Sequence, residues 1–112
     1  MALGEQVVGI KVSVKRYVSD DPQPGIVECE LIDANGESHL FIEKTSIVSE
    51  DDLDAHSSYP LPGLIACTIL DRRHDEIGTD LICIDIEKPY SIESIEGKTR
   101  FVVLPDQIRD VD

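Results

Sequence analysis

The sequence predicts one mainly β domain, residues 1–112, built as a small antiparallel barrel or a sandwich of about six strands with one short helix near 49–56. Three observations predict this class. Short apolar blocks alternate with turn residues along the chain, an Asn-Gly dipeptide marks a tight hairpin, and only one segment carries the signals of a helix start.

The first predicted strand has apolar residues at every second position, and lysine or serine between them. This period of two is typical of a half-buried strand. The pattern loosens at residues 16–18, where a bulge would redirect the chain, and a loop at 20–25 with two prolines ends it. A second strand follows at 26–33. The core-facing positions are Val8, Ile10, Val12 and Val14 in the first strand, and Val27, Cys29 and Leu31 in the second.

The dipeptide Asn35-Gly36 predicts a two-residue type I′ turn, because both central residues of that turn need a positive φ. With this loop, Leu31 lies opposite Leu40 and Cys29 lies opposite Ile42, facing the core. Phe41 is then expected on the less buried face, together with Ile32 and His39. On that face, Lys11 and Lys15 are expected beside Glu28 and Glu30.

The predicted helix begins at Ser49, whose hydroxyl suits an N-cap, and acidic residues follow in its first turn. Val48 and Leu53 have the spacing of an apolar staple around the cap. The proline-rich segment 57–63 ends the helix.

Two near-continuous apolar runs, Leu64–Leu70 and Leu81–Ile86, predict strands buried on both faces, joined by a polar loop at 71–78. Phe101–Leu104 predicts a last strand. The order of elements is that of an OB-like (oligonucleotide/oligosaccharide-binding) barrel with one extra strand, and an SH3-like barrel or a sandwich has nearly the same order.

The charge narrows the classes of function. The chain has 23 acidic and 10 basic residues, a net charge of −13, with three Tyr, two Phe and no Trp. Such a field repels nucleic acid and anionic membranes, and aromatic platforms for stacking bases are scarce. We therefore expect no nucleic acid and no membrane partner. Without a predicted leader or spanning segment, we expect a cytoplasmic location.

No pattern of residues predicts chemistry. Cys29, Cys67 and Cys83 lack C-x-x-C spacing and are expected as small buried apolar residues. Asp52 with His56, and the run His74-Asp75-Glu76, match no calcium or zinc ligand pattern, so we expect no metal or other cofactor. No nucleophile or phosphate-binding motif occurs, so the chain is not expected to be an enzyme.

The sequence is most consistent with an acidic protein-binding module, of the inhibitor or immunity type, that covers a basic site on a partner protein. Complementary charge favours such encounters, and the predicted partner-binding residues are Glu50, Asp51, Asp52 and Asp54. An alternative is a structural or assembly module, a homodimer or an adaptor, that uses the outer face of the 26–43 hairpin through Ile32, His39 and Phe41. A small enzyme or a ligand-binding barrel is a third reading.

Overall fold

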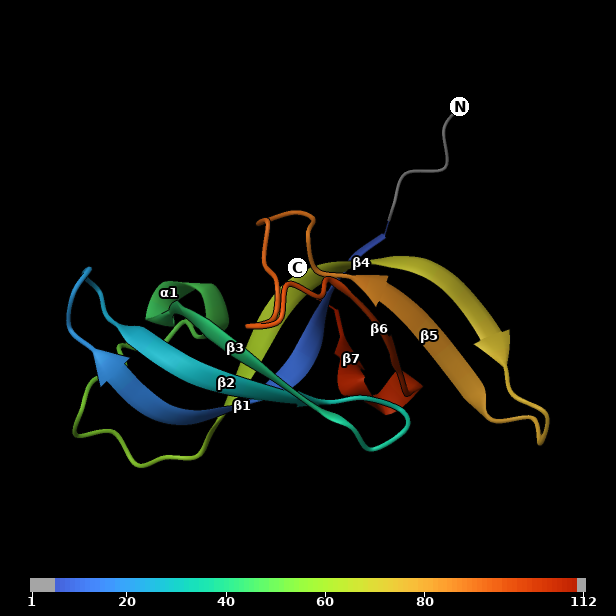
Figure 1. Cartoon of the computed structure of the whole chain (residues 1–112), viewed down its shortest axis with the longest axis horizontal. Helices are drawn as coiled ribbons and strands as arrows, with labels where there is room; N and C mark the ends of the chain where they lie inside the picture. Colours follow the sequence, from blue (N-terminus) through green and yellow to red (C-terminus); the bar gives the residue numbers. More distant parts are fainter. Residues whose placement is uncertain (1–5, 111–112) are drawn as a thin grey trace.

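A computed structural model describes residues 6–110, in which seven β-strands form one curled antiparallel sheet (Figure 1). The strands follow the order β3-β2-β1-β4-β5-β6, and β7 pairs with β1 off this path. The predicted mainly β, antiparallel, barrel-like fold is confirmed. The elements are β1 (Gln6–Ser19), β2 (Ile26–Ile32), β3 (Ser38–Lys44), α1 (Thr45–Val48), β4 (Leu61–His74), β5 (Asp80–Asp85), β6 (Arg100–Val103), a 3₁₀ turn (Pro105–Gln107) and β7 (Ile108–Arg109).

β1 is central to the sheet, because it pairs with β4 along its first half and with β2 along its second half. Two register shifts against β2 fall between residues 14 and 19, where the apolar pattern loosens. Irregularities of this kind increase the local twist and help a sheet to curl. The alternation along β1 is confirmed, since the buried side chains are those of Val8, Ile10, Val12 and Val14.

The β2–β3 hairpin differs from the predicted register by one residue. Its loop has three residues instead of two: the Gly36 amide donates to the Asp33 carbonyl at 3.0 Å, and Gly36 has a φ of 82°. Asn35 does not take a positive φ. This is a type I turn followed by a glycine bulge, not a type I′ turn. Leu31 therefore pairs with His39 rather than Leu40.

β3 consequently turns the other face to the core. Phe41 is 1% exposed and meets Phe101 edge to face at 5.8 Å between ring centroids, while Ile42 is 43% exposed. His39 is buried and Leu40 is only half-buried. The prediction that Leu40 and Ile42 face inward and Phe41 and His39 outward is wrong, because a slip of one residue exchanges the faces of a strand.

Two other hairpin turns repeat the geometry of this loop. In each, a glycine with a φ of 82–86° donates its amide to the carbonyl three residues earlier. The side chain of that earlier residue accepts the amides two and four residues later. The first residue is Asp33, Asp75 or Ser94, and the glycine is Gly36, Gly78 or Gly97. An acceptor side chain three residues before glycine thus defines all three loops.

The helix lies earlier than predicted. The one short helix is present as α1, Thr45–Val48, but its predicted position near 49–56 is wrong, because residues 49–60 form bends, irregular backbone and one turn. The Ser49 hydroxyl accepts the Asp51 amide at 3.0 Å, a local bond that competes with helix formation. Val48 and Leu53 are both buried. The apolar pair that suggested a helix start anchors the connection to the core instead.

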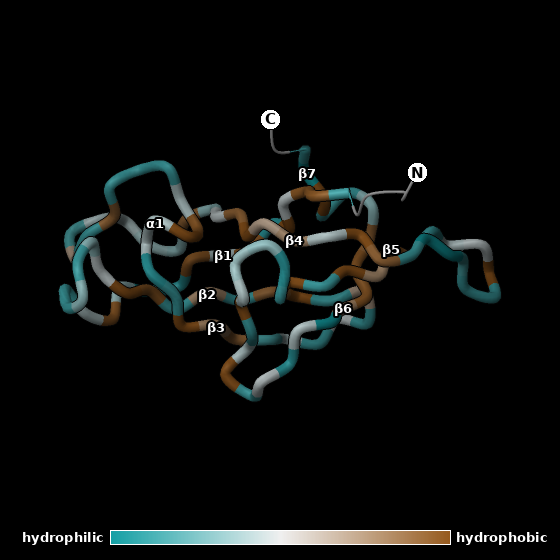
Figure 2. The backbone as a smooth tube through the Cα atoms, turned by 90° about the horizontal axis from the view of Figure 1, so that it is seen from above, coloured by the Kyte–Doolittle hydropathy of each residue, from teal (hydrophilic) through white to brown (hydrophobic). Residues whose placement is uncertain are grey.

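β4 and β5 continue beyond the sheet as a two-stranded arm, residues 70–80, in which every residue is exposed (Figure 1). The first half of the predicted 71–78 loop is therefore strand, and its second half is the turn at the tip of the arm. Figure 2 shows that the arm is largely hydrophilic, with a short apolar stretch at its tip, and that most apolar segments lie in the body of the sheet. The expectation that both strands are buried on both faces fails at Leu70, which is 40% exposed.

The curled sheet leaves a seam between β3 and β6. In the part of the chain that the structure describes, no strand ladder joins these two edges. Two backbone hydrogen bonds cross the seam instead, one from the β2–β3 turn to β6 and one from the loop before β6 to β3. The Ala34 amide donates to the Val102 carbonyl at 2.8 Å, and the Ile95 amide donates to the Leu40 carbonyl at 2.9 Å. The tip of the β2–β3 hairpin is thereby held against β6.

The register of β3 predicts the relative cost of two truncations. Phe41→Ala should lower the free energy of unfolding by about 3–5 kcal/mol, because it leaves a cavity in the core. Ile42→Ala, on the outer face, should cost about 1 kcal/mol or less. Urea denaturation of the two variants measures the difference. A larger loss for Ile42→Ala would contradict the observed register.

Candidate functional site

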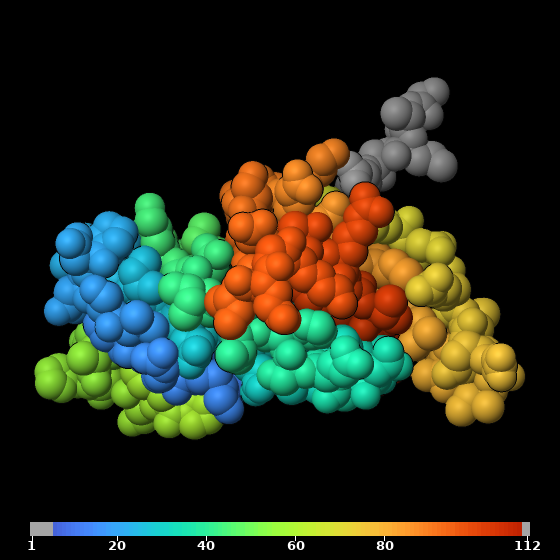
Figure 3. All heavy atoms as spheres, in the orientation of Figure 1, coloured from blue at the N-terminus to red at the C-terminus, as the bar shows by residue number. Residues whose placement is uncertain are grey.

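The four carboxylates predicted to bind a partner lie at one end of the molecule. Glu50, Asp51, Asp52 and Asp54 are all exposed in the connection that follows α1. A second acidic loop, with exposed Asp20 and Asp21 between β1 and β2, lies at the same end (Figures 1 and 3). We call these six residues the acidic end. Among the described residues, no basic side chain forms an ion pair with any of them.

Carboxylates from both acidic loops affect the pKa of the Tyr17 hydroxyl. Its hydroxyl donates to Asp20 at 2.7 Å. The pKa of Tyr17 is raised to about 12, mainly by this hydrogen bond, and further by burial and by the neighbouring Asp20, Tyr59 and Asp54. Asp20 and Asp54, which are more than thirty positions apart in the sequence, thus both raise the pKa of one phenol, so the two loops lie near each other.

The alternative interface is not assembled as the sequence suggested. Of its three predicted residues, Ile32 is 44% exposed, whereas His39 and Phe41 are buried in the core. The outer face of the hairpin instead carries Ile32, Leu40 and Ile42 among acidic side chains. The expected cross-strand ion pairs are present in part, since Lys15 lies 3.6 Å from Glu30, and Arg16 rather than Lys11 pairs with Glu28.

A cleft of about 420 Å³ lies where the hairpin tip meets β4, β5 and β6. We call it the seam cleft. Its walls combine apolar and charged side chains, including those of Asp33, Glu37, Arg73, Lys98, Arg100 and Phe101. Three of the ten basic residues of the chain therefore line one cleft. Lys98 Nζ lies 5.4 Å from the centre of the Phe101 ring, and Arg100 Nε lies 3.8 Å from Asp85.

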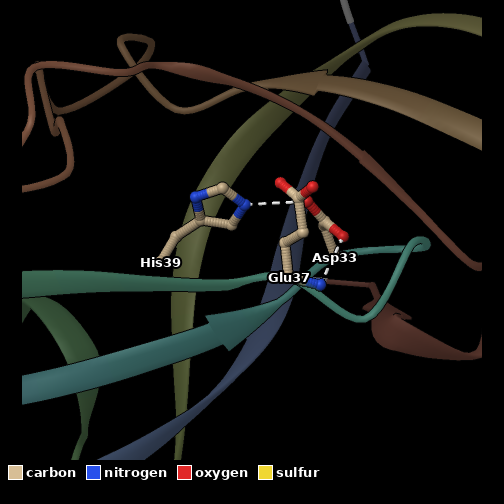
Figure 4. A group of neighbouring side chains, drawn as sticks. All are labelled: Asp33, Glu37 and His39. Atoms are coloured by element: carbon tan, nitrogen blue, oxygen red, sulfur yellow. Dashed lines mark hydrogen bonds and ion pairs between the residues drawn. The ribbon is translucent and has the colours of Figure 1, made fainter.

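Asp33, Glu37 and His39 bring two carboxylates and an imidazole together at the rim of the seam cleft (Figure 4). His39 Nε2 lies 2.7 Å from Asp33 Oδ2, and both side chains are less than 10% exposed. Asp33 Oδ1 accepts the amides of Asn35 at 2.8 Å and Glu37 at 3.0 Å. The His39 ring packs edge to face on Phe101 at 4.8 Å. This set is the one group of three potential metal ligands found among residues 6–110.

Burial has the largest single influence on the pKa of Asp33, and it acts to raise it. The hydrogen bond from His39, the two backbone amides and the charge of the imidazole together outweigh this influence. The pKa of Asp33 is therefore lowered below its ordinary value. The carboxylate is held in its charged form at the point where the hairpin turns.

The acidic and histidine clusters that the sequence drew attention to have structural roles. His74 Nδ1 pairs with Asp80 at 2.6 Å across the arm, and Asp75 accepts two amides in the arm turn. Asp52 and His56 do not share a helix, and the His56 amide donates to Asp54. The structure thus brings together none of these residues as a set of three ligands within the part that it describes.

The cysteines differ in exposure. Cys29 and Cys67 are buried, and burial, with lesser contributions from nearby carboxylates, raises the pKa of each thiol to about 12. Cys83 is half-buried and lines the seam cleft. The prediction of three buried cysteines is confirmed for two of them.

No helix among the described residues has the length and apolarity needed to cross a bilayer. Comparison with protein-family models, with curated proteins and with solved structures gives no match.

The lowered pKa of Asp33 predicts a pH dependence of stability. Its stabilising effect is complete above the unfolded pKa of about 3.9 and is lost as the pH falls through the lower folded value. Asp33→Asn should be less stable than the wild type at pH 6, and the difference should shrink between pH 5 and pH 2. Urea midpoints across this range measure it. Asp75→Asn is the matched control, since Asp75 caps a similar turn without a histidine, and equal pH profiles for both variants would contradict the role of the Asp33–His39 pair.

The exposure of the thiols predicts two classes of reactivity. A thiol reagent should modify Cys83 in the native protein well before Cys29 and Cys67, because the thiolate is the reactive form and burial suppresses it. Mass spectrometry of time points locates the label. Labelling of Cys29 or Cys67 at the rate of Cys83 would mean that the core opens more readily than its packing suggests.

Proposed function

We propose that the protein is an acidic protein-binding module that uses the acidic end to cover a basic site on a partner protein. The observation that supports this proposal is the convergence of six exposed carboxylates from two loops, with no basic partner among the described residues. Loops held on a rigid β scaffold are where binding residues gather. An inhibitor or immunity-type protein of this kind presents carboxylates where the partner binds anions.

The negative charge of the acidic end favours association with a positively charged partner surface. Unpaired carboxylates attract a cationic partner over about 10 Å at 0.1 M salt, which accelerates encounter. Lys15 and Arg16 pair with β2, Lys98 and Arg100 lie at the seam cleft, and no described basic side chain forms an ion pair with the acidic end. The acidic end is therefore not neutralised from within. Its expected partner surface is rich in arginine and lysine.

Neutralising the acidic loop should weaken binding to such a partner. A partner is first recovered by affinity capture at low salt and elution at high salt. The variant Glu50→Gln, Asp51→Asn, Asp52→Asn, Asp54→Asn should then associate with it at least about tenfold more slowly, with a flatter dependence on salt. Surface plasmon resonance from 50 to 500 mM salt measures both effects.

The matched control removes four charges elsewhere, through Glu76→Gln, Glu87→Gln, Glu96→Gln and Asp106→Asn. All four residues are exposed and lie outside the two acidic loops. This variant should keep most of the association rate. Equal slowing in both variants would mean that net charge acts without a defined surface, and unchanged binding in the loop variant would remove the acidic end from the interface.

A second candidate is an assembly module that uses the outer face of the hairpin. Its support is the exposure of Ile32 and Ile42, 44% and 43% respectively, on one face of β2 and β3. Apolar side chains grouped on a surface mark interfaces. A homodimer formed there would persist at high salt, unlike a complex made by the acidic end, so sedimentation at 50 and 500 mM salt separates the two proposals.

A further inference from the structure

Asp33, Glu37 and His39 offer three ligand atoms, two carboxylate oxygens and one imidazole nitrogen, within 4.8 Å of one another. In a tetrahedral zinc site with bonds of about 2.0–2.1 Å, neighbouring ligand atoms lie about 3.3 Å apart. His39 Nε2 and Asp33 Oδ2 lie 2.7 Å apart, about 0.6 Å closer than two ligands of one such ion, and the other separations are at most 4.8 Å. Binding therefore requires this pair to separate slightly and the exposed Glu37 side chain to rotate toward it (Figure 4).

Two of the three ligands are already fixed in place. Asp33 Oδ1 is held by two backbone amides, and the His39 ring is packed against Phe101. Supporting contacts of this kind orient the ligands of metal sites and raise their affinity. Little conformational freedom would be lost when Asp33 and His39 bind an ion. The ion would replace the proton between His39 Nε2 and Asp33 Oδ2, and Glu37 would become ordered.

Glu37 is the residue that points to a cation. Its carboxylate is exposed and has no hydrogen bond or ion pair with another described residue, yet it lies beside the charged Asp33 (Figure 4). Two carboxylates at this separation repel each other. Among the described residues, none of the basic side chains of the cleft forms an ion pair with Glu37, and His39 contacts Asp33 rather than Glu37. A positive ion between the carboxylates would remove it.

The position of the three residues also leaves room for an ion. Asp33 and Glu37 line the seam cleft, so water or a ligand has access to the remaining coordination positions. Three protein ligands with an open position are typical of accessible zinc sites. An imidazole in the set favours zinc and related transition ions over magnesium and calcium. We propose that Asp33, Glu37 and His39 bind one zinc-class divalent cation at the rim of the seam cleft.

Titration of the chelator-treated full chain with Zn²⁺, in excess Mg²⁺, tests this site. Calorimetry should show one tight ion per chain, and Glu37→Gln should weaken its binding by about tenfold or more. Glu76→Gln removes the same charge from the arm and should leave binding unchanged. Both residues are exposed, so both variants should fold, which circular dichroism checks.

Nuclear magnetic resonance with Zn²⁺ locates the ion. The imidazole signals of His39 and the amide signals of the β2–β3 turn should shift together with one equivalent of metal. Equal Zn²⁺ affinity in the two glutamine variants would overturn the proposal. So would shifts centred on residues 50–54, which would indicate loose binding to the acidic end. A His39 ring that titrates with pH but does not respond to Zn²⁺ would overturn it as well, since a protonated imidazole would then supply the positive charge.

Discussion

The carboxylate of Asp33 is the contact on which the arrangement of the β2–β3 hairpin depends. By accepting the amides of Asn35 and Glu37, it stabilises a three-residue loop in which Gly36 alone takes a positive φ. The loop length sets the register, and the register turns Phe41 and His39 into the core. The same carboxylate then holds His39 against β6. One side chain thus links a local turn to the closure of the curled sheet.

Much of the fold was predictable because side-chain alternation is a local property. The period of two along β1, the bulge after Val14 and the apolar runs of β4 and β5 all correspond to strands. The register of the hairpin was predicted wrongly because the Asn-Gly pair was interpreted without the aspartate two residues before it. The spacing of an acceptor side chain three residues before glycine, which recurs at Asp75 and Ser94, is the signal that would have given the loop length.

The two functional surfaces differed in how far the sequence could predict them. The carboxylates at 50–54 are adjacent in the chain, so composition alone drew attention to them, but their proximity to Asp20 depends on the packing of two distant loops. The predicted register did not place Asp33, Glu37 and His39 on one face of the hairpin. With a two-residue loop, His39 falls on the face opposite Asp33. With the correct loop, Asp33, Glu37 and His39 share the inward face of the hairpin.

The arm of β4 and β5 carries a strand edge through which molecules of this protein could pair with one another. Within the described residues, β1 pairs with β4 only as far as Ile69, so the stretch 71–74 presents an open strand edge. Open edges invite pairing with strands of other chains, and charged side chains on them discourage it. Asp71, Arg72 and Arg73 occupy this edge and are exposed. The charged side chains of the arm therefore discourage its open edge from pairing with strands of neighbouring molecules.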